Sequence, residues 1–330
     1  MLRAALLYLS EREGLRRWLL KRRFARGVAY RFVAGDTLDA AMEACRALEA
    51  RGMRASLDYL GESVTNREEA EAAVEAYLAA IERIAAQKAK ASVSLKLTAL
   101  GLGIDETFCA TNLARIVHRA HPHGVFVRID MEQSDHVEAT LRLHRHLFAR
   151  YRNVGVVIQA ALRRSKKDVL DLREREAPVR LVKGAYKESE EVAFQKKREV
   201  DKSFVELLEI LAEGSGPLAV ATHDPALIRR AKSLSRARAR VPAAASGGGA
   251  GNPGSGGGAE PEFGNPSFEF QLLYGVRRDL QKRLVEEGYD VRVYVPYGTQ
   301  WYAYLLRRLA ERPANLAFIV RSVLRETFRR

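Results

Sequence analysis

Residues 141–160 read Leu-Arg-Leu-His-Arg-His-Leu-Phe-Ala-Arg-Tyr-Arg-Asn-Val-Gly-Val-Val-Ile-Gln-Ala, and this stretch contains the repeating unit of the fold. Its first part carries Leu141, Leu143, Leu147 and Phe148, which return at the spacing of one helix face. The run 154–160 is apolar and β-branched until Gln159, as expected of a strand that is buried on both faces. The stretch therefore predicts a helix that leads into a buried strand.

Runs of this kind recur along the whole chain. We identify eight, each followed by a helical or polar segment, as expected when parallel strands alternate with crossover helices. Eight strands close a parallel barrel. A doubly wound open sheet is the competing topology, but no Gly-x-Gly-x-x-Gly turn follows any run. The predicted fold is an α/β (βα)8 TIM-like barrel with N-terminal helices and a C-terminal helix over the barrel mouth. Its predicted strands cover residues 54–60, 92–98, 125–131, 154–160, 179–184, 218–223, 268–273 and 291–296.

The chain divides at the first predicted strand into a helical arm, residues 1–53, and a barrel domain, residues 54–330. The arm contains an amphipathic helix from Thr37 to Ala50, for which Asp36 is the expected N-cap. A second helix is predicted over residues 66–90, and we expect both to lie outside or beside the barrel. Between Gly247 and Gly258 eight of twelve residues are glycine, so a flexible insertion at about 242–266 is predicted between the sixth helix and the seventh strand.

The beginning of the arm is strongly basic. Residues 1–31 hold nine Lys or Arg and two Glu, together with Leu15, Trp18, Leu19 and Leu20, a combination typical of a basic amphipathic helix. We favour a solvated helix that packs on the barrel by one face, and keep a reversible contact with an anionic membrane as the alternative. The net charge of +14 also raises nucleic acid as a partner, with binding that weakens steeply with salt. The basic residues lack interleaved aromatic side chains, so we expect no nucleic acid.

Composition places the protein in a reducing compartment. Its two cysteines, Cys45 and Cys109, are too few and too scattered for a disulfide framework. The apolar start from Ala4 to Leu9 is shorter than the core of a signal peptide, and no run of 18 apolar residues occurs. We therefore expect a cytoplasmic protein, with the inner face of the cell membrane as the site of any peripheral contact.

Polar side chains stand at the carboxyl ends of five of the eight predicted strands. In a parallel barrel these ends meet at one mouth, where the reacting groups of such folds lie. A single polar residue there is more often a rim or core residue, but five strands together indicate a charged pocket. The residues are Lys96, Asp130, Gln159, Arg180, Lys183, Thr222 and His223.

After the last strand, which holds Tyr294, a helix carries Tyr304, Arg307, Arg308 and Glu311. Tyr304 shares a helix face with the two arginines, which lie three and four residues further on. Paired arginines suit a carboxylate because each planar guanidinium can donate two parallel hydrogen bonds. The helix therefore predicts a carboxylate site, against the alternative of a solvated basic face.

Six motifs, taken in order, resemble those of the proline dehydrogenases. Ser-Leu-Lys-Leu-Thr-Ala-Leu-Gly surrounds Lys96, and the other five occupy residues 128–132, 179–186, 221–224, 268–275 and 304–311. The resemblance implies oxidation of L-proline to Δ1-pyrroline-5-carboxylate by hydride transfer to FAD, the first step of proline degradation to glutamate. It also implies that the electrons pass to a quinone.

The resemblance further implies a role for each matching residue. Arg180 would lie beside flavin N5, where a cation stabilises the negative charge that develops on the ring, and Arg180 and Asp130 would form the catalytic part of the site. Lys96, Arg307 and Arg308 would hold the proline carboxylate, with Asp130 and Glu311 orienting these cations and Tyr294 and Tyr304 shaping the pocket. The residues expected to bind FAD are Met131, Gln159, Arg180, Val182, Lys183, Gly184, Ala185, Thr222 and His223.

Lys96 and the histidines raise two other chemistries. Lys96 could act as the Schiff-base lysine of a barrel aldolase, because a lysine in an apolar strand can have a lowered pKa. Six of the seven histidines lie between His118 and His146, but their spacings span two helices and a loop, so we expect no metal site.

Overall fold

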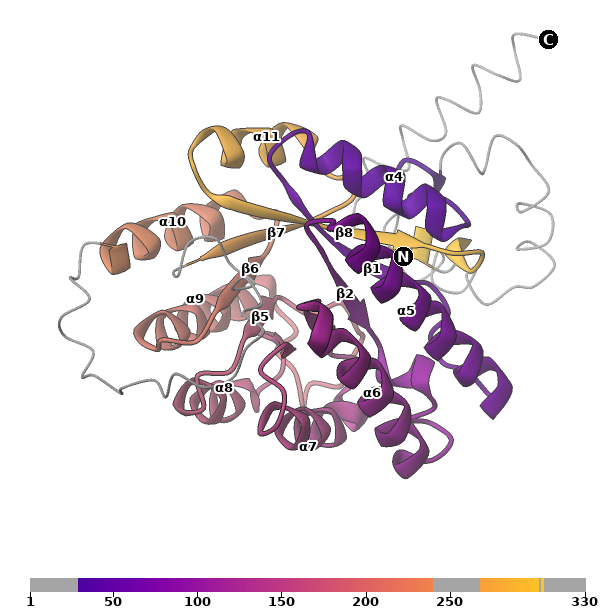
Figure 1. Ribbon diagram of the computed structural model, residues 1–330. Helices are drawn as coiled ribbons and strands as arrows, with labels where there is room; N and C mark the ends of the chain where they lie inside the picture. The colour runs from indigo at the N-terminus through magenta and orange to yellow at the C-terminus, as the bar shows by residue number, and fades with distance from the viewer. Residues whose placement is uncertain (1–28, 240–267, 303, 306–330) are drawn as a thin grey trace, which may run out of the picture.

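A computed structural model describes residues 29–239, 268–302 and 304–305, in which eight parallel strands form one closed barrel (Figure 1). Each strand pairs with the next in chain order, and β8 pairs with β1 from Arg54 opposite Arg292 to Tyr59 opposite Tyr297. The predicted (βα)8 barrel is therefore confirmed. The strands are β1 (Arg54–Tyr59), β2 (Ala91–Leu95), β3 (Val127–Ile129), β4 (Val154–Gln159), β5 (Val179–Val182), β6 (Leu218–Ala221), β7 (Glu269–Leu273) and β8 (Asp290–Tyr297).

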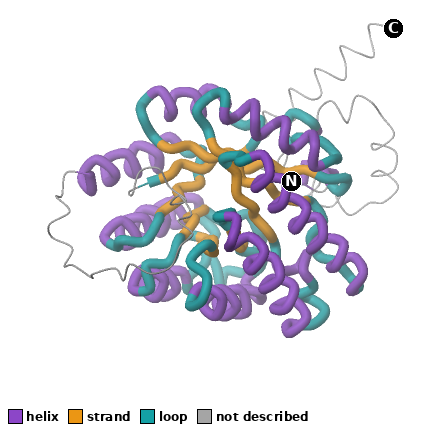
Figure 2. The backbone as a smooth tube through the Cα atoms, viewed as in Figure 1, coloured by secondary structure: helices purple, strands orange, loops and turns teal. Residues whose placement is uncertain are grey.

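The helices surround the strands on the outside of the barrel (Figure 2). Their apolar faces are buried against the strands, as Phe204, Leu207, Leu208 and Leu211 of α9 illustrate. The helices are α4 (Leu38–Glu49), α5 (Arg67–Gln87), α6 (Glu106–Ala120), α7 (Val137–Phe148), α8 (Ser165–Glu174), α9 (Lys197–Glu213), α10 (Pro225–Ala239) and α11 (Arg278–Glu286), with short 3-10 turns η1 (Leu97–Leu100), η2 (His121–His123) and η3 (Ser134–His136). In the described part of the chain, no helix combines the length and the apolar character needed to cross a membrane.

The two helices expected outside or beside the barrel occupy different positions. Helix α4 packs on β1 and β8, where these strands close the barrel. Helix α5 connects β1 to β2 and packs on both strands, so it is the first crossover helix of the barrel itself.

The N-cap of α4 is Thr37, and the expectation of Asp36 is wrong. Thr37 has an extended backbone and its hydroxyl accepts a hydrogen bond from the Ala40 amide, whereas the Asp36 carboxylate accepts one from the Tyr30 hydroxyl. Two adjacent residues were both suitable caps by type, and the backbone conformation selects the second.

Several predicted strands run past their true ends. The run 92–98 ends as a strand at Leu95, because the last paired residues of β2 and β3 are Leu95 and Ile129. Lys96 keeps an extended backbone, and the chain then turns into η1. Lys96, Asp130, Lys183 and Thr222 likewise directly follow the last residues of their strands, whereas Gln159 and Arg180 lie within β4 and β5.

Polar side chains cross the barrel interior. Arg292 pairs with Glu269 at 2.9 Å and donates to Ser92 at 3.1 Å, and all three side chains are buried. Arg180 of β5 donates to Ser94 of β2 at 2.9 Å. Because β2 and β5 are not neighbours, these two side chains meet only through the interior. Buried charges need partners, and Ser94 supplies one to Arg180 from inside the barrel.

Candidate active site

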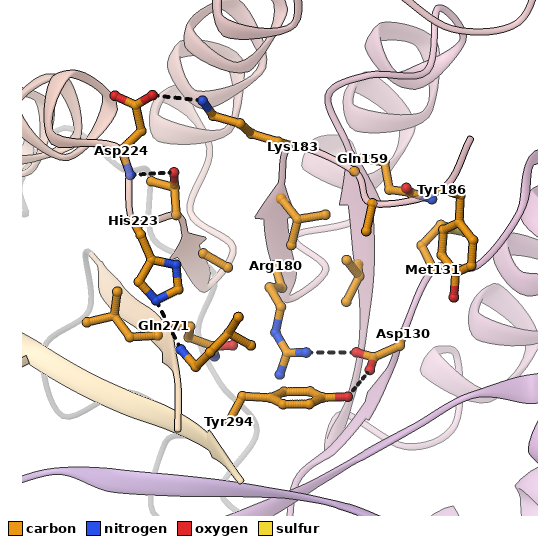
Figure 3. A pocket seen from close by; sticks show the side chains of 18 of the residues that line it. Asp130, Met131, Gln159, Arg180, Lys183, Tyr186, His223, Asp224, Gln271 and Tyr294 are labelled. Atoms are coloured by element: carbon orange, nitrogen blue, oxygen red, sulfur yellow. Dashed lines mark hydrogen bonds and ion pairs between the residues drawn. The ribbon is translucent and has the colours of Figure 1, made fainter. Parts of the chain in front are cut away.

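One cavity of about 710 Å³ opens at the carboxyl ends of the strands (Figure 3). It brings together all the predicted site residues that lie in the described part of the chain. These are Lys96, Asp130, Met131, Gln159, Arg180, Val182, Lys183, Gly184, Ala185, Thr222, His223, Tyr294 and Tyr304. The other three, Arg307, Arg308 and Glu311, lie outside the described residues.

Arg180, Asp130 and Tyr294 form a hydrogen-bonded group on one side of the cavity. Arg180 donates to Asp130 at 2.7 Å, and the Tyr294 hydroxyl donates to the other oxygen of the same carboxylate, also at 2.7 Å. The guanidinium carbon of Arg180 lies 5.4 Å from the centre of the Tyr294 ring, and Figure 3 shows the two groups facing each other. Burial, with Asp130 nearby, raises the pKa of Tyr294 well above its usual value, so the phenol remains a donor. The Arg180 guanidinium is therefore held in one place by residues on, or directly after, the strands β3, β5 and β8.

The Nε atom of Arg180 is buried and has no hydrogen-bond partner among the described residues. A buried donor without a partner costs free energy unless a ligand or water accepts from it. Arg180 thus retains one hydrogen-bond donor that no described residue satisfies.

Lys96 is surrounded by acceptors. Its ammonium donates to both oxygens of Asp58, at 3.0 and 3.2 Å, lies 3.4 Å from Glu62 and is 3.5 Å from the Tyr294 hydroxyl. Although burial lowers the pKa of Lys96, Asp58 and its other partners outweigh burial and raise it well above the usual value. The lowered pKa expected for a Schiff-base lysine is therefore wrong, because the surroundings of Lys96 are anionic rather than apolar.

Asp58 is fully buried under Lys96 and was not among the predicted site residues. Burial raises its pKa to about 6, with Lys96 acting in the opposite direction and Asp130 adding to the rise. Its signal in the sequence is faint: Ser56 and Asp58 are two residues apart in β1 and so point to the same face of the strand. A polar pair on an inward face indicates a polar interior only once the barrel is known.

A tight turn after β5 forms the opposite side of the cavity. Gly184 has φ +110°, and a Cβ atom there would lie 3.0 Å from Gln159 Oε1 and 3.1 Å from the Ala161 Cβ. The Gln159 amide donates to the Glu132 carbonyl at 2.7 Å, which fixes the orientation of the side chain. Glycine therefore lets the backbone approach Gln159 closely and leaves this wall open to a ligand.

A cluster of two lysines and two aspartates lies at one edge of the cavity. Lys183 pairs with Asp201 at 2.5 Å and with Asp224 at 2.9 Å, and Lys197 pairs with both carboxylates. Burial opposes ionisation of Asp224, but hydrogen bonds from Lys183 and Lys197 outweigh burial and hold its pKa well below the usual range. Next to this cluster, His223 Nε2 accepts from the Leu273 amide at 3.3 Å.

Five further polar side chains line the cavity without having been predicted there: Tyr186, Lys197, Asp224, Gln271 and Arg277. Tyr186, Asp224 and Gln271 lie inside the motifs at residues 179–186, 221–224 and 268–275. Membership of these motifs is the sequence feature that could have identified them. Lys197 begins α9 and Arg277 precedes α11, and a charged residue at a helix start is too common to indicate a site.

Residues 41–321 match the family model described as Proline dehydrogenase. The chain belongs to the proline dehydrogenase family. It is 40% identical over 326 residues to Proline dehydrogenase 1 of Bacillus subtilis, covering 99% of this chain and all of that one. It is 37% identical over 328 residues to Proline dehydrogenase of Deinococcus radiodurans, covering 98% of both.

Among solved structures, the chain is similar to proline utilization A (PutA) from Bdellovibrio bacteriovorus inactivated by N-propargylglycine. The TM-score is 0.74 and the identity 26%, over 86% of this chain and 32% of the PutA chain. This chain therefore corresponds to about a third of that larger protein.

Proposed function

We propose that this chain is an FAD-dependent oxidoreductase that acts on a CH–NH bond and converts L-proline to Δ1-pyrroline-5-carboxylate. The observation that carries the proposal is the single cavity that holds Lys96, Arg180, Asp130 and Tyr294 at the strand ends. Membership of the proline dehydrogenase family, which is flavin-dependent, supports the reaction. The product would enter the degradation of proline to glutamate.

The residues present fit a flavin. Val157, Val182, Ala221 and Leu272 give the cavity an aliphatic lining suited to a flat ring, and Gly184 leaves room for close approach of that ring. Lys183, Lys197 and Arg277 place positively charged donors at the edge where the diphosphate of FAD would lie, and each of them is also paired with an aspartate. Met131, Gln159, Ala185, Thr222 and His223 complete the proposed cofactor site.

The chemistry that a bound flavin supplies is acceptance of a hydride from the carbon next to the substrate nitrogen. Arg180 places a fixed cation in the cavity, and Asp130 and Ser94 keep it from rotating away. A cation that is already in position needs no reorganisation as negative charge develops, so it lowers the barrier more than a mobile one.

Lys96 would bind the proline carboxylate together with Arg307 and Arg308. Asp58, Glu62 and Tyr294 already surround its ammonium, so Lys96 alone offers little uncompensated charge. The additional positive charge needed to bind a carboxylate therefore falls to the two arginines, oriented by Glu311 in this proposal.

Product analysis tests the reaction. Purified enzyme, L-proline and a soluble quinone should yield a product two hydrogens lighter than proline, detected by mass spectrometry. Cyclopentanecarboxylate, which has the ring and the carboxylate but no amine, should compete with proline without being oxidised. Absence of the dehydrogenated product with every quinone tried would contradict the proposal.

We propose further that the enzyme is cytoplasmic and meets its quinone at the inner face of the cell membrane through residues 1–31. The basic and apolar residues of that stretch suit an anionic lipid surface. The protein should sediment with vesicles of phosphatidylglycerol and phosphatidylcholine at low salt and be released at high salt. A variant without residues 1–28 should stay in the supernatant, and equal sedimentation of both proteins would contradict this proposal.

A further inference from the structure

The segment that precedes α4 lies against the end of β8, on the side of the barrel where the cavity opens. The Ala34 amide donates to the Pro296 carbonyl at 2.9 Å, and the Gly298 amide donates to the Gly35 carbonyl at 2.9 Å. These two hydrogen bonds fix residues 34 and 35 to the strand that carries Tyr294. We call residues 29–33, which lead into them, the strap.

The strap is packed into an apolar cluster that is separate from the main core. Its members Ala29, Phe32 and Val33 are at most 3% exposed. They share the cluster with residues of the β1 and β7 loops and with the beginning of the C-terminal helix: Leu60, Val276, Trp301, Tyr302, Tyr304 and Leu305.

Two residues connect this cluster to the cavity. Tyr304 belongs to the cluster and lines the cavity. Leu273, which also lines the cavity, packs against the cluster from β7. The cavity wall on this side therefore depends on the strap, whereas Arg180 and Asp130 are held by hydrogen bonds inside the barrel.

The contact between the strap and the turn after β7 is unusually close. Gly275 has φ +72°, and a Cβ atom built on it would lie 1.7 Å from the Arg31 carbonyl oxygen and 2.8 Å from the Arg31 carbonyl carbon. Any side chain at residue 275 would thus have to displace the strap backbone. Gly288 has a similar φ of +82°, but a Cβ there meets nothing within 4 Å.

We propose that the strap is a positioning element for substrate binding: by packing against the start of the C-terminal helix, it sets the place of Tyr304 in the cavity wall. The proposal rests on the proposed function, because it assigns the strap to the wall that would enclose the proline ring. A displaced strap would loosen that wall and weaken proline binding. It would leave the Arg180 group, and hence the chemical step, in place.

The test compares Gly275→Ala with Gly288→Ala in a Trp18→Phe background. Both alanines are placed in the left-handed region, so both carry the same backbone strain, but only the first collides with the strap. Trp301, 2% exposed and inside the cluster, is then the only tryptophan of the chain and reports on the strap through its fluorescence. Phe32→Ala and Phe32→Leu provide a second pair that does not change the backbone.

We expect Gly275→Ala and Phe32→Ala to red-shift the emission of Trp301 and to raise the KM for proline about tenfold, with kcat and flavin content changed less than about twofold. Gly288→Ala should match the parent in all four measurements, and Phe32→Leu should restore most of the KM. If Trp301 shifts while KM stays at the parent value, the strap does not position the substrate wall. An unshifted Trp301 in both variants would show that the strap does not pack as described. If the parent itself does not oxidise proline, the proposed function fails instead, and the fluorescence arm still tests the packing.

Discussion

At the scale of single residues, the site depends on where charge is buried. Asp58 and Lys96 form a buried pair, and the pKa of Asp58 is raised to about 6 chiefly by burial. A carboxylate bound at Lys96 would repel ionised Asp58 and raise its pKa further, so binding would take up a proton. The affinity for such a ligand should therefore increase as the pH falls through about 6.

Calorimetric titration with cyclopentanecarboxylate tests this linkage, since the ligand has no amine that titrates in the same range. We expect about fivefold tighter binding near pH 5.5 than near pH 7.5, with proton uptake visible as a dependence of the heat on the buffer. Asp58→Asn should abolish the pH dependence, because the amide cannot take up the proton. If the pH dependence is unchanged in Asp58→Asn, it arises from another group near Lys96. Glu62, Asp130 and Tyr294 are the other groups that face Lys96.

Arg180 provides the second prediction at this scale. Arg180→Ala removes a fixed cation from the cavity and should lower kcat about 100-fold or more and shift the flavin midpoint potential. Ser94→Ala removes only one of the hydrogen bonds that hold Arg180, leaves the bond to Asp130, and should have a much smaller effect on both quantities. Stopped-flow reduction measures the rate, and potentiometry measures the midpoint potential. A rate within about twofold of the parent and an unchanged potential in Arg180→Ala would show that Arg180 takes no part in the chemistry.

At the scale of elements, the sequence predicted the order and number of the strands but placed some of their ends wrongly. Apolar and β-branched residues continue past the last paired residue of β2, and only the neighbouring strand determines where pairing stops. Asp58 was missed for a related reason: an aspartate inside a six-residue strand is equally compatible with a solvated face. Which face lies inside the barrel follows from closure of the sheet, and no single strand carries that information.

The cap of α4 gives a prediction at the same scale. Thr37→Ala removes the hydroxyl that accepts from the Ala40 amide and should lower the free energy of unfolding by about 1 kcal/mol. Asp36→Ala removes a surface contact with Tyr30 and should cost clearly less. Urea unfolding followed by circular dichroism measures both, and a larger loss in Asp36→Ala would return the cap to that residue.

At the scale of the whole molecule, the two ends of the barrel have separate roles. The residues described on either side of the glycine-rich insertion are the end of α10 and the start of β7, so the insertion is attached at the amino ends of the strands. The cavity opens at their carboxyl ends. In this fold, connections that lead into the amino ends of the strands belong to the end opposite the mouth, so we expect the insertion to make no contribution to the site.

Deletion of residues 247–258 should therefore leave kcat and the KM for proline within about twofold of the full chain. Steady-state kinetics of the two proteins make the comparison, with thermal unfolding as a check that the shortened chain folds. A large change in KM with unchanged unfolding would mean that the insertion reaches the site.

The most direct test of the account is the visible absorbance spectrum of the purified protein under anaerobic conditions, before and after addition of L-proline. If the cavity at the barrel mouth holds a flavin against proline, the protein should be yellow, alone or after addition of FAD, and should bleach when proline is added. A colourless protein that gains no colour with FAD, or a yellow protein whose spectrum proline does not change, would contradict the account.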